Sequence, residues 1–152
     1  MNYTVSQTEI DAMLRTDLSS FIMRSFLELN PASAYMHNWH IDLIASKLNE
    51  VHLGKCKRLI INIPPRNMKS ICASVAFPAW LLGHDPSLRI ICASYGQDLS
   101  EKLALDCRSI MKTDLYNSAV PQTLISPAKG ALHDFMTTQQ GGRLATSVGG
   151  VI

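Results

Sequence analysis

The chain has 152 residues, of which 47% are hydrophobic and 17% are charged. This composition supplies a buried core and excludes disordered and collagen-like chains, and the length fits one domain or part of one. The formal net charge of +2 does not by itself indicate a polyanionic partner. The charge is unevenly distributed, however. Residues 1–50 carry three basic and six acidic side chains (−3), residues 51–112 carry nine and four (+5), and residues 113–152 carry two of each.

The cysteines and histidines have no spacing typical of a metal site. Cys56, Cys72, Cys92 and Cys107 include no CxxC pair and have no partner histidine at zinc spacing. The histidines His37, His52, His84 and His133 also have no spacing typical of metal ligands. We expect reduced thiols in a cytoplasmic protein. The chain start lacks the order of a signal peptide, and the most apolar run, residues 71–83, is too short to span a bilayer. We therefore expect no membrane segment.

Residues 1–54 are predicted to form a helical lead-in. Apolar residues at three-to-four spacing predict one helix over residues 7–29, which ends at Asn30-Pro31 because proline lacks a donor and disfavours helix in the preceding residue. A second helix is predicted over residues 38–53, with Gly54 placed to cap its end.

From residue 55 onward the pattern changes to that of an α/β domain. Short β-branched runs at residues 57–63 and 89–94 predict two strands buried on both faces. Each is followed by a predicted helix, over residues 71–82 and 98–112, and Asp98 is the expected N-cap of the latter. This order predicts parallel β-α-β units with right-handed crossovers.

The last part of the chain predicts a β-hairpin. Residues 133–138 and 143–148 alternate in hydrophobicity and flank the turn Gln139-Gln140-Gly141-Gly142. An apolar strand begins at residues 149–152, where the sequence stops. We therefore expect the domain to be incomplete.

The residues that indicate chemistry are Lys69 and Ser70, at the head of a predicted helix after the Pro64-Pro65 turn. A helix start has unpaired N–H groups and partial positive charge, both suited to a polyphosphate. There, Lys69 would reach the β- and γ-phosphates and the Ser70 hydroxyl would bind Mg²⁺. Ile63 and Met68 replace the glycines of the pattern G-x-x-x-x-G-K-[ST]. The alternative is an ordinary helix start with a solvated lysine.

The surrounding sequence resembles the large terminase subunit of tailed bacteriophages and prophages, the ATP-driven motor that pumps DNA into the capsid and cuts it. The resemblance runs from about residue 31 to the end and is carried by Trp39-His40-Ile41-Asp42, residues 58–70, residues 79–83, Ala93-Ser94-Tyr95, residues 135–138 and Gly141-Gly142-Arg143. In that family a proline-rich approach to the lysine replaces the first glycine, whereas Met68 departs from the commoner glycine. The resemblance implies a P-loop NTPase-type parallel sheet flanked by helices.

The resemblance also implies roles for particular residues. Lys69 and Ser70 match the phosphate and magnesium ligands, and Arg66 matches a loop arginine whose charge would stabilise a transferring phosphoryl group. Trp39 and His40 match the segment that holds adenine; the alternative is a core tryptophan beside a hydrogen-bonded histidine. The implied ATP-binding residues are Trp39, His40, Pro65, Arg66, Asn67, Met68, Lys69, Ser70 and Ile71, with Arg66 and Lys69 as the catalytic candidates and Ser70 as the metal ligand.

In that family the acidic Walker B strand follows the stretch that matches residues 148–152, and a nuclease domain comes later. Asp134 is the last acidic residue here. We therefore expect residues 55–152 to be an ATPase core that ends before Walker B, with at most weak nucleotide binding and negligible turnover by itself. The resemblance implies that the full protein acts on double-stranded DNA with a portal protein and a small terminase subunit, and that it can assemble as a homo-oligomer. Two other interpretations remain: a degenerate prophage remnant acting as a non-catalytic interaction module, and a helicase-like P-loop ATPase fragment.

Overall fold

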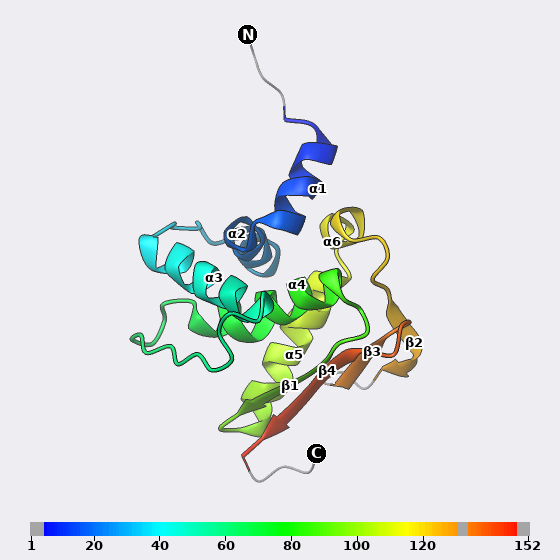
Figure 1. Ribbon diagram of the computed structural model, residues 1–152. Helices are drawn as coiled ribbons and strands as arrows, with labels where there is room; N and C mark the ends of the chain where they lie inside the picture. Colours follow the sequence, from blue (N-terminus) through cyan, green and yellow to red (C-terminus); the bar gives the residue numbers. More distant parts are fainter. Residues whose placement is uncertain (1–4, 131–133, 149–152) are drawn as a thin grey trace.

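The computed structural model describes residues 5–130 and 134–148, which form an α/β fold (Figure 1). A four-stranded mixed sheet lies at one end of the molecule, and the helices pack behind it and extend away from it. The predicted α/β class, with helices flanking a sheet, is confirmed. Among the described residues no helix is both long enough and apolar enough to cross a lipid bilayer. All four cysteines are free thiols, as expected.

The predicted helix over residues 7–29 is wrong in one respect, because it is two helices. α1 (Gln7–Thr16) and α2 (Leu18–Leu29) meet at Asp17, whose backbone is extended (φ −116°, ψ 105°). The Asp17 side chain accepts a hydrogen bond of 2.9 Å from the Ser20 N–H group and so caps α2. α3 (Trp39–His52) follows the predicted bounds closely, and Gly54 beyond its end has the positive φ of a C-terminal cap (+71°).

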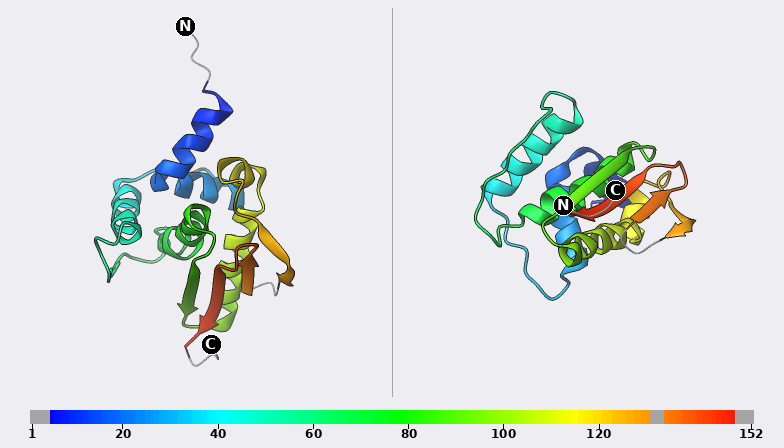
Figure 2. Two further views of the ribbon diagram at one scale, coloured as in Figure 1. Left: turned by 45° about the vertical axis from the view of Figure 1, so that its right-hand side comes forward. Right: turned by 90° about the horizontal axis from the view of Figure 1, so that it is seen from below.

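A continuous helical stretch over residues 69–84 occupies the centre of the molecule. It begins with one turn, continues as the π-helix η1 (Ile71–Ala76) and ends as α4 (Phe77–His84). This central helix contacts α2, α3 and α5 (Figure 2), so apolar side chains are buried on several of its sides. Its fully buried side chains include Cys72, Val75, Ala76, Ala79 and Leu82.

Pro78 interrupts the hydrogen bonding of this central helix. At this point the π-helix passes into α4, and the Phe77 N–H group still bonds to the Cys72 carbonyl, five residues back. An N–H group at residue 78 would bond to the carbonyl of Ala73 in that register, or of Ser74 in the α-helical register, but proline has no N–H group. The Arg143 Nη2 donates to the Ser74 carbonyl at 3.2 Å. Arg143 is only 1% exposed, and its Nε and Nη1 atoms are buried with no hydrogen-bond partner. A buried guanidinium therefore ties the strand that carries it to the central helix.

The sheet has the strand order β1-β4-β3-β2. Its strands are β1 (Arg89–Ser94), β2 (Ile125–Gly130), β3 (Asp134–Thr137) and β4 (Gly142–Ser147). β1 and β4 are parallel, whereas β3 runs antiparallel to both β4 and β2. The predicted parallel pairing is present only between β1 and β4, in a sheet that is mixed, and the predicted hairpin is confirmed as β3 and β4. His133, at the start of the predicted hairpin, lies outside the described residues.

Helices α5 (Gln97–Met111) and α6 (Asp114–Ala119) connect β1 to β2. α5 packs against β1 and β4 and so covers one face of the sheet (Figure 2). Its N-cap is Gly96 rather than the predicted Asp98, which lies in the first turn. An acidic side chain there still interacts favourably with the helix dipole.

The strand predicted over residues 57–63 is wrong, because this stretch pairs with none of the strands described. It contributes to a hollow beside α3, and its side chains alternate: Leu59, Ile61 and Ile63 pack against the core, whereas Ile60 is 84% exposed. Neither this stretch nor β1, where Ile91 is exposed, is buried on both faces as predicted. A strand also needs a neighbour to hydrogen-bond with, and β1 pairs with β4 instead.

The contact between Arg143 and the Ser74 carbonyl can be tested with a double-mutant cycle. Pro78→Ala adds an N–H group that bonds to the Ser74 carbonyl when this turn takes the α-helical register, so the hydrogen bond from Arg143 then contributes less to stability. We expect Arg143→Met to cost about 1 kcal/mol more of unfolding free energy in the Pro78 protein than in the Pro78→Ala protein. Urea unfolding of the four proteins measures this difference, and an equal cost in both backgrounds would contradict the explanation.

Candidate functional site

The loop before the central helix has an unusual backbone. Arg66 and Met68 have positive φ angles, +66° and +59°, although neither is glycine. The left-handed conformation costs a non-glycine residue roughly 1–2 kcal/mol. The loop is braced by Asn67, whose Nδ2 donates to the carbonyl oxygens of Pro64 and Pro65, both at 3.2 Å. The structure therefore holds this loop in a strained shape, as is common at functional sites.

The backbone conformation of this loop has the pattern of an anion-binding site. Met68 is left-handed, and residues 69 and 70 already have helical geometry. Such an alternation of left- and right-handed residues forms a concavity of N–H groups, the anion-binding nest. The first bond of the helix runs from the Cys72 N–H group to the Met68 carbonyl at 2.9 Å, so the N–H groups of residues 69–71 lie in the first turn, where partners are lacking.

The predicted loop residues come together around one hollow of about 500 Å³. Its lining consists of Phe26 together with Pro64, Pro65, Arg66, Asn67, Met68, Lys69, Ser70 and Ile71. Arg66, Lys69 and Ser70 are exposed. The lining contains two cationic side chains and no carboxylate, and among the described residues no acidic side chain forms an ion pair with either cation. This arrangement suits an anion.

Trp39 and His40 lie at a different hollow. They begin α3 and, with residues 43, 44, 47 and 59–63, line a space of about 280 Å³. This space and the loop hollow are lined by consecutive stretches of chain, residues 59–63 and 64–71. Trp39 is 72% exposed, so the alternative of a core tryptophan is wrong. The structure does not place Trp39 or His40 in the lining of the loop hollow.

Just before α3, His37 and Asp42 form a polar contact. The Asp42 carboxylate accepts from the Ser19 hydroxyl at 2.6 Å and lies 2.8 Å from His37 Nε2. These hydrogen bonds, that of Ser19 first, hold the pKa of Asp42 below its usual value. The Ser19–Asp42 bond joins α2 to α3, and the His37–Asp42 contact links the residues before α3 to its first turn, which contains Trp39 and His40.

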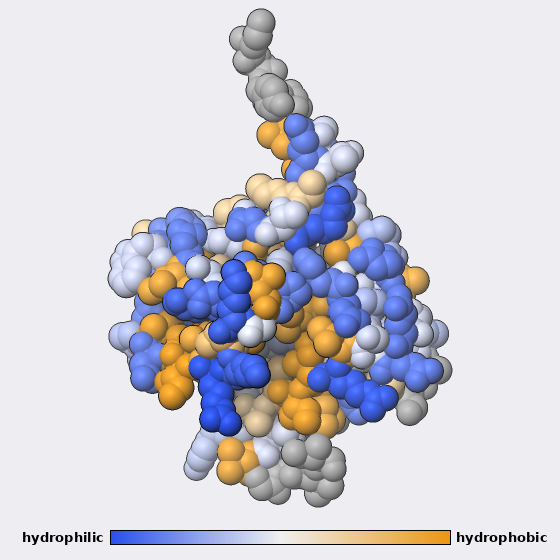
Figure 3. Space-filling view, in the orientation of Figure 1, coloured by the Kyte–Doolittle hydropathy of each residue, from blue (hydrophilic) through white to orange (hydrophobic). Residues whose placement is uncertain are grey.

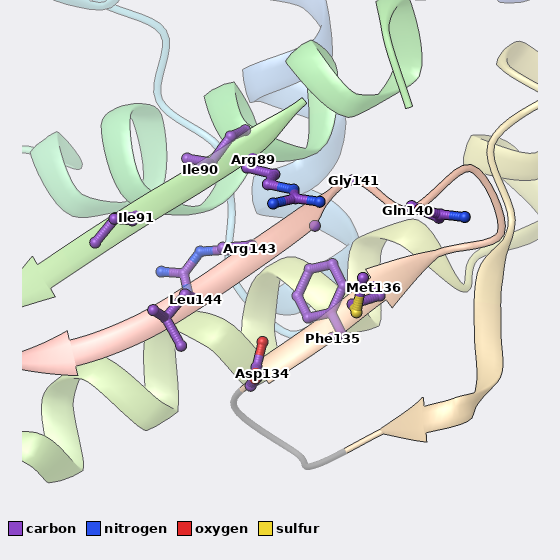
Figure 4. A pocket seen from close by; sticks show the side chains of 11 residues that line it. Arg89, Ile90, Ile91, Asp134, Phe135, Met136, Gln140, Gly141, Arg143 and Leu144 are labelled. Carbon is purple, nitrogen blue, oxygen red and sulfur yellow. The ribbon is translucent and has the colours of Figure 1, made fainter. Parts of the chain in front are cut away.

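A third hollow, of about 420 Å³, lies on the sheet and contains none of the predicted site residues (Figure 4). Its lining comes from β1, β3, β4 and the turn before β4, and it includes two arginines, Arg89 and the buried Arg143, and one carboxylate, Asp134. Figure 3 shows hydrophobic side chains gathered over the strands on this face, next to hydrophilic ones. Unlike the loop hollow, this hollow contains a carboxylate in its lining.

Sequence reasoning missed Phe26 of α2, which completes the lining of the loop hollow and has its ring centroid 5.5 Å from that of Tyr35. No local signal distinguishes it from the other apolar residues of its helix. Among the described residues no group of three or more His, Cys, Asp or Glu side chains could hold a metal ion. No protein-family model, curated protein or solved structure matches the chain, so the resemblance to terminases stays a prediction.

The left-handed conformation of Met68 predicts that glycine is more stabilising than alanine at this position, the reverse of their order within a helix. Both Met68→Ala and Met68→Gly remove the side chain, but only glycine relieves the cost of positive φ. We expect the glycine protein to be more stable than the alanine protein by about 1 kcal/mol. At Leu105, an exposed position within α5, alanine should be the more stable by about 1 kcal/mol. Chemical unfolding tests both pairs, and the same order at both positions would contradict the assigned loop conformation.

Proposed function

We propose that the loop of residues 64–71 binds the phosphates of a nucleoside triphosphate, and that the chain belongs to the ATPase part of a terminase-type DNA-packaging motor. The observation that carries the proposal is the left-handed backbone at Arg66 and Met68 directly before the helix. In P-loops, glycine provides this conformation. At a non-glycine residue this conformation costs free energy, and such strained residues are typical of functional sites.

The surroundings of the loop support phosphate over other anions. The N-terminus of the central helix carries partial positive charge, and the body of this helix is buried, so solvent screens it less than a surface helix. Lys69 and Arg66 add two full charges to the same hollow. A polyphosphate, with several negative charges and many acceptor oxygens, matches this combination better than a carboxylate does.

The chain's own residues suggest distinct parts in binding. Lys69 would contribute a mobile ammonium to the terminal phosphates, and Arg66 a planar guanidinium whose fork matches phosphate oxygens. The Ser70 hydroxyl would serve as one Mg²⁺ ligand. Because the lining of the hollow contains no carboxylate, it supplies neither a charged ligand for Mg²⁺ nor a base that would activate the attacking water. We therefore propose nucleotide binding as the activity of this chain, and hydrolysis only for an assembly that adds such a group.

The adjacent hollow beside α3 suits a base. Trp39 is exposed there, and its ring lies at 90° to that of His40, with the two centroids 6.3 Å apart. An aromatic face and a ring nitrogen offer stacking and a hydrogen bond, which together recognise a purine. We propose that adenine lies against this pair. The partners, namely DNA, portal protein and small terminase subunit, rest on the resemblance alone.

Lys69→Ala tests the phosphate part of this proposal. Loss of a charge-assisted contact should weaken the binding of an ATP analogue with Mg²⁺, measured by calorimetry, on the order of tenfold or more. Lys57→Ala is the matched control, because Lys57 is also exposed and lies outside the hollow. Equal affinities for the wild type and the Lys69→Ala protein would contradict the proposal that Lys69 binds the phosphates.

His40→Ala tests the base part separately. The change should weaken ATP binding severalfold and leave the binding of inorganic triphosphate unchanged, because triphosphate has no base. Calorimetric titration of the same protein with each ligand gives both values. Similar losses for the two ligands would mean that His40 acts through the fold or the phosphates.

A further inference from the structure

Outside the candidate site, the described residues bring two histidines together. His52 is the last residue of α3 and His84 is the last residue of α4, and their ring centroids lie 5.0 Å apart with an angle of 61° between the ring planes. They are 32 positions apart in the sequence, so no spacing motif connects them. His84 is exposed and His52 is half-buried, which leaves the pair open to solvent on one side.

The protonation of the His84 ring is fixed by a neighbour. Its Nδ1 lies 2.8 Å from the carbonyl oxygen of Trp80. A carbonyl oxygen only accepts hydrogen bonds, so Nδ1 carries the hydrogen and donates, and in the neutral ring Nε2 holds the free electron pair. Histidines that bind metal ions nearly always donate their other ring N–H in this way, which orients the ring and raises its basicity.

The separation of the two rings also matches coordination. With metal–nitrogen bonds of about 2.0–2.1 Å, two imidazoles on one tetrahedral ion have centroids roughly 5 Å apart. Burial and the nearby His84 lower the pKa of His52, which favours its neutral form. A neutral imidazole is the form that binds a metal ion.

We propose that His52 and His84 form a binding site for a divalent transition-metal ion of the nickel, copper and zinc class, which joins the C-terminal ends of α3 and α4. Imidazole nitrogen suits these ions, whereas Mg²⁺ and Ca²⁺ prefer oxygen ligands. Two protein ligands leave the other coordination positions to water. The bound ion connects α3, which begins with Trp39 and His40, to the central helix that begins at Lys69. The site stands independently of nucleotide binding.

Trp80 provides a direct readout. Its ring centroid lies 3.9 Å from that of His84 and 5.0 Å from that of His52, and the residue is buried. The chain has two tryptophans, so Trp39→Phe leaves Trp80 as the sole tryptophan. Ni²⁺ bound by the histidine pair should quench the fluorescence of Trp80, and EDTA should reverse the quenching. Ni²⁺ also avoids the redox chemistry of copper with the four thiols.

The experiment is a Ni²⁺ titration of the Trp39→Phe protein at pH 7.5, followed by Zn²⁺ competition. We expect saturable quenching with one ion per chain, and a loss of affinity on the order of tenfold or more in both His52→Ala and His84→Ala. His37→Ala, which removes an exposed histidine paired with Asp42, is the control and should bind as before. Bound Ni²⁺ should also raise the urea midpoint of the parent protein but not of the two variants.

Three results would overturn the proposal. The first is an absence of saturable quenching in the parent, which would mean that the rings only pack against Trp80. The second is unchanged affinity in His52→Ala or in His84→Ala, which would assign the ion to a single side chain. The third is equal loss in His37→Ala. Circular dichroism of each variant establishes that the fold is retained, and His84→Ala changes an exposed residue, so at least this test stands if His52→Ala fails to fold.

Discussion

The arrangement of this protein depends on how the central helix tolerates Pro78. Proline supplies no N–H group to the turn before it, and residues 71–76 of that turn form a π-helix. The Arg143 guanidinium of β4 donates to the Ser74 carbonyl in this turn, while its two other nitrogens are buried without partners. A costly group of this kind persists where the surrounding structure requires it. Here it holds the sheet and the central helix in one orientation.

That orientation matters because the loop of residues 64–71 sits at the start of the same helix. The π-helix begins directly after Ser70, so its wider turn and the strained loop are neighbours. Two departures from ordinary backbone geometry thus occur within about two helical turns of each other. Burial of the helix body prevents the loop from relaxing by moving the helix. The shape suited to phosphate is therefore preorganised by packing rather than by glycine.

Local patterns in the sequence predicted much of this fold correctly. Apolar periodicity located the longer helices, and Gly141-Gly142 between alternating residues located the hairpin, because both signals arise within short segments. The short helix α6 and the strand β2 were not predicted. The loop around Lys69 was predicted from the same kind of local signal. The break at Asp17 was missed because a single capping side chain competes there with a strong apolar stripe.

Features that depend on distant segments could not be predicted. The pattern of residues 57–63 indicates an extended backbone, but strand pairing is decided by which neighbour is available. Phe26 reaches the loop hollow, and His52 reaches His84, only through the packing of helices. The positive φ of Met68 also opposes the intrinsic preference of methionine, so tertiary structure imposes it.

The most direct test of the central claim is to observe the backbone amides of the loop while phosphate is added. Amide chemical shifts of the ¹⁵N-labelled protein, followed during titration with inorganic triphosphate, report on each N–H group separately. The account predicts saturable shifts that are largest at residues 68–71, where the left-handed turn meets the helix. Unchanged amides in this stretch, with shifts confined to the hollow on the sheet, would contradict it.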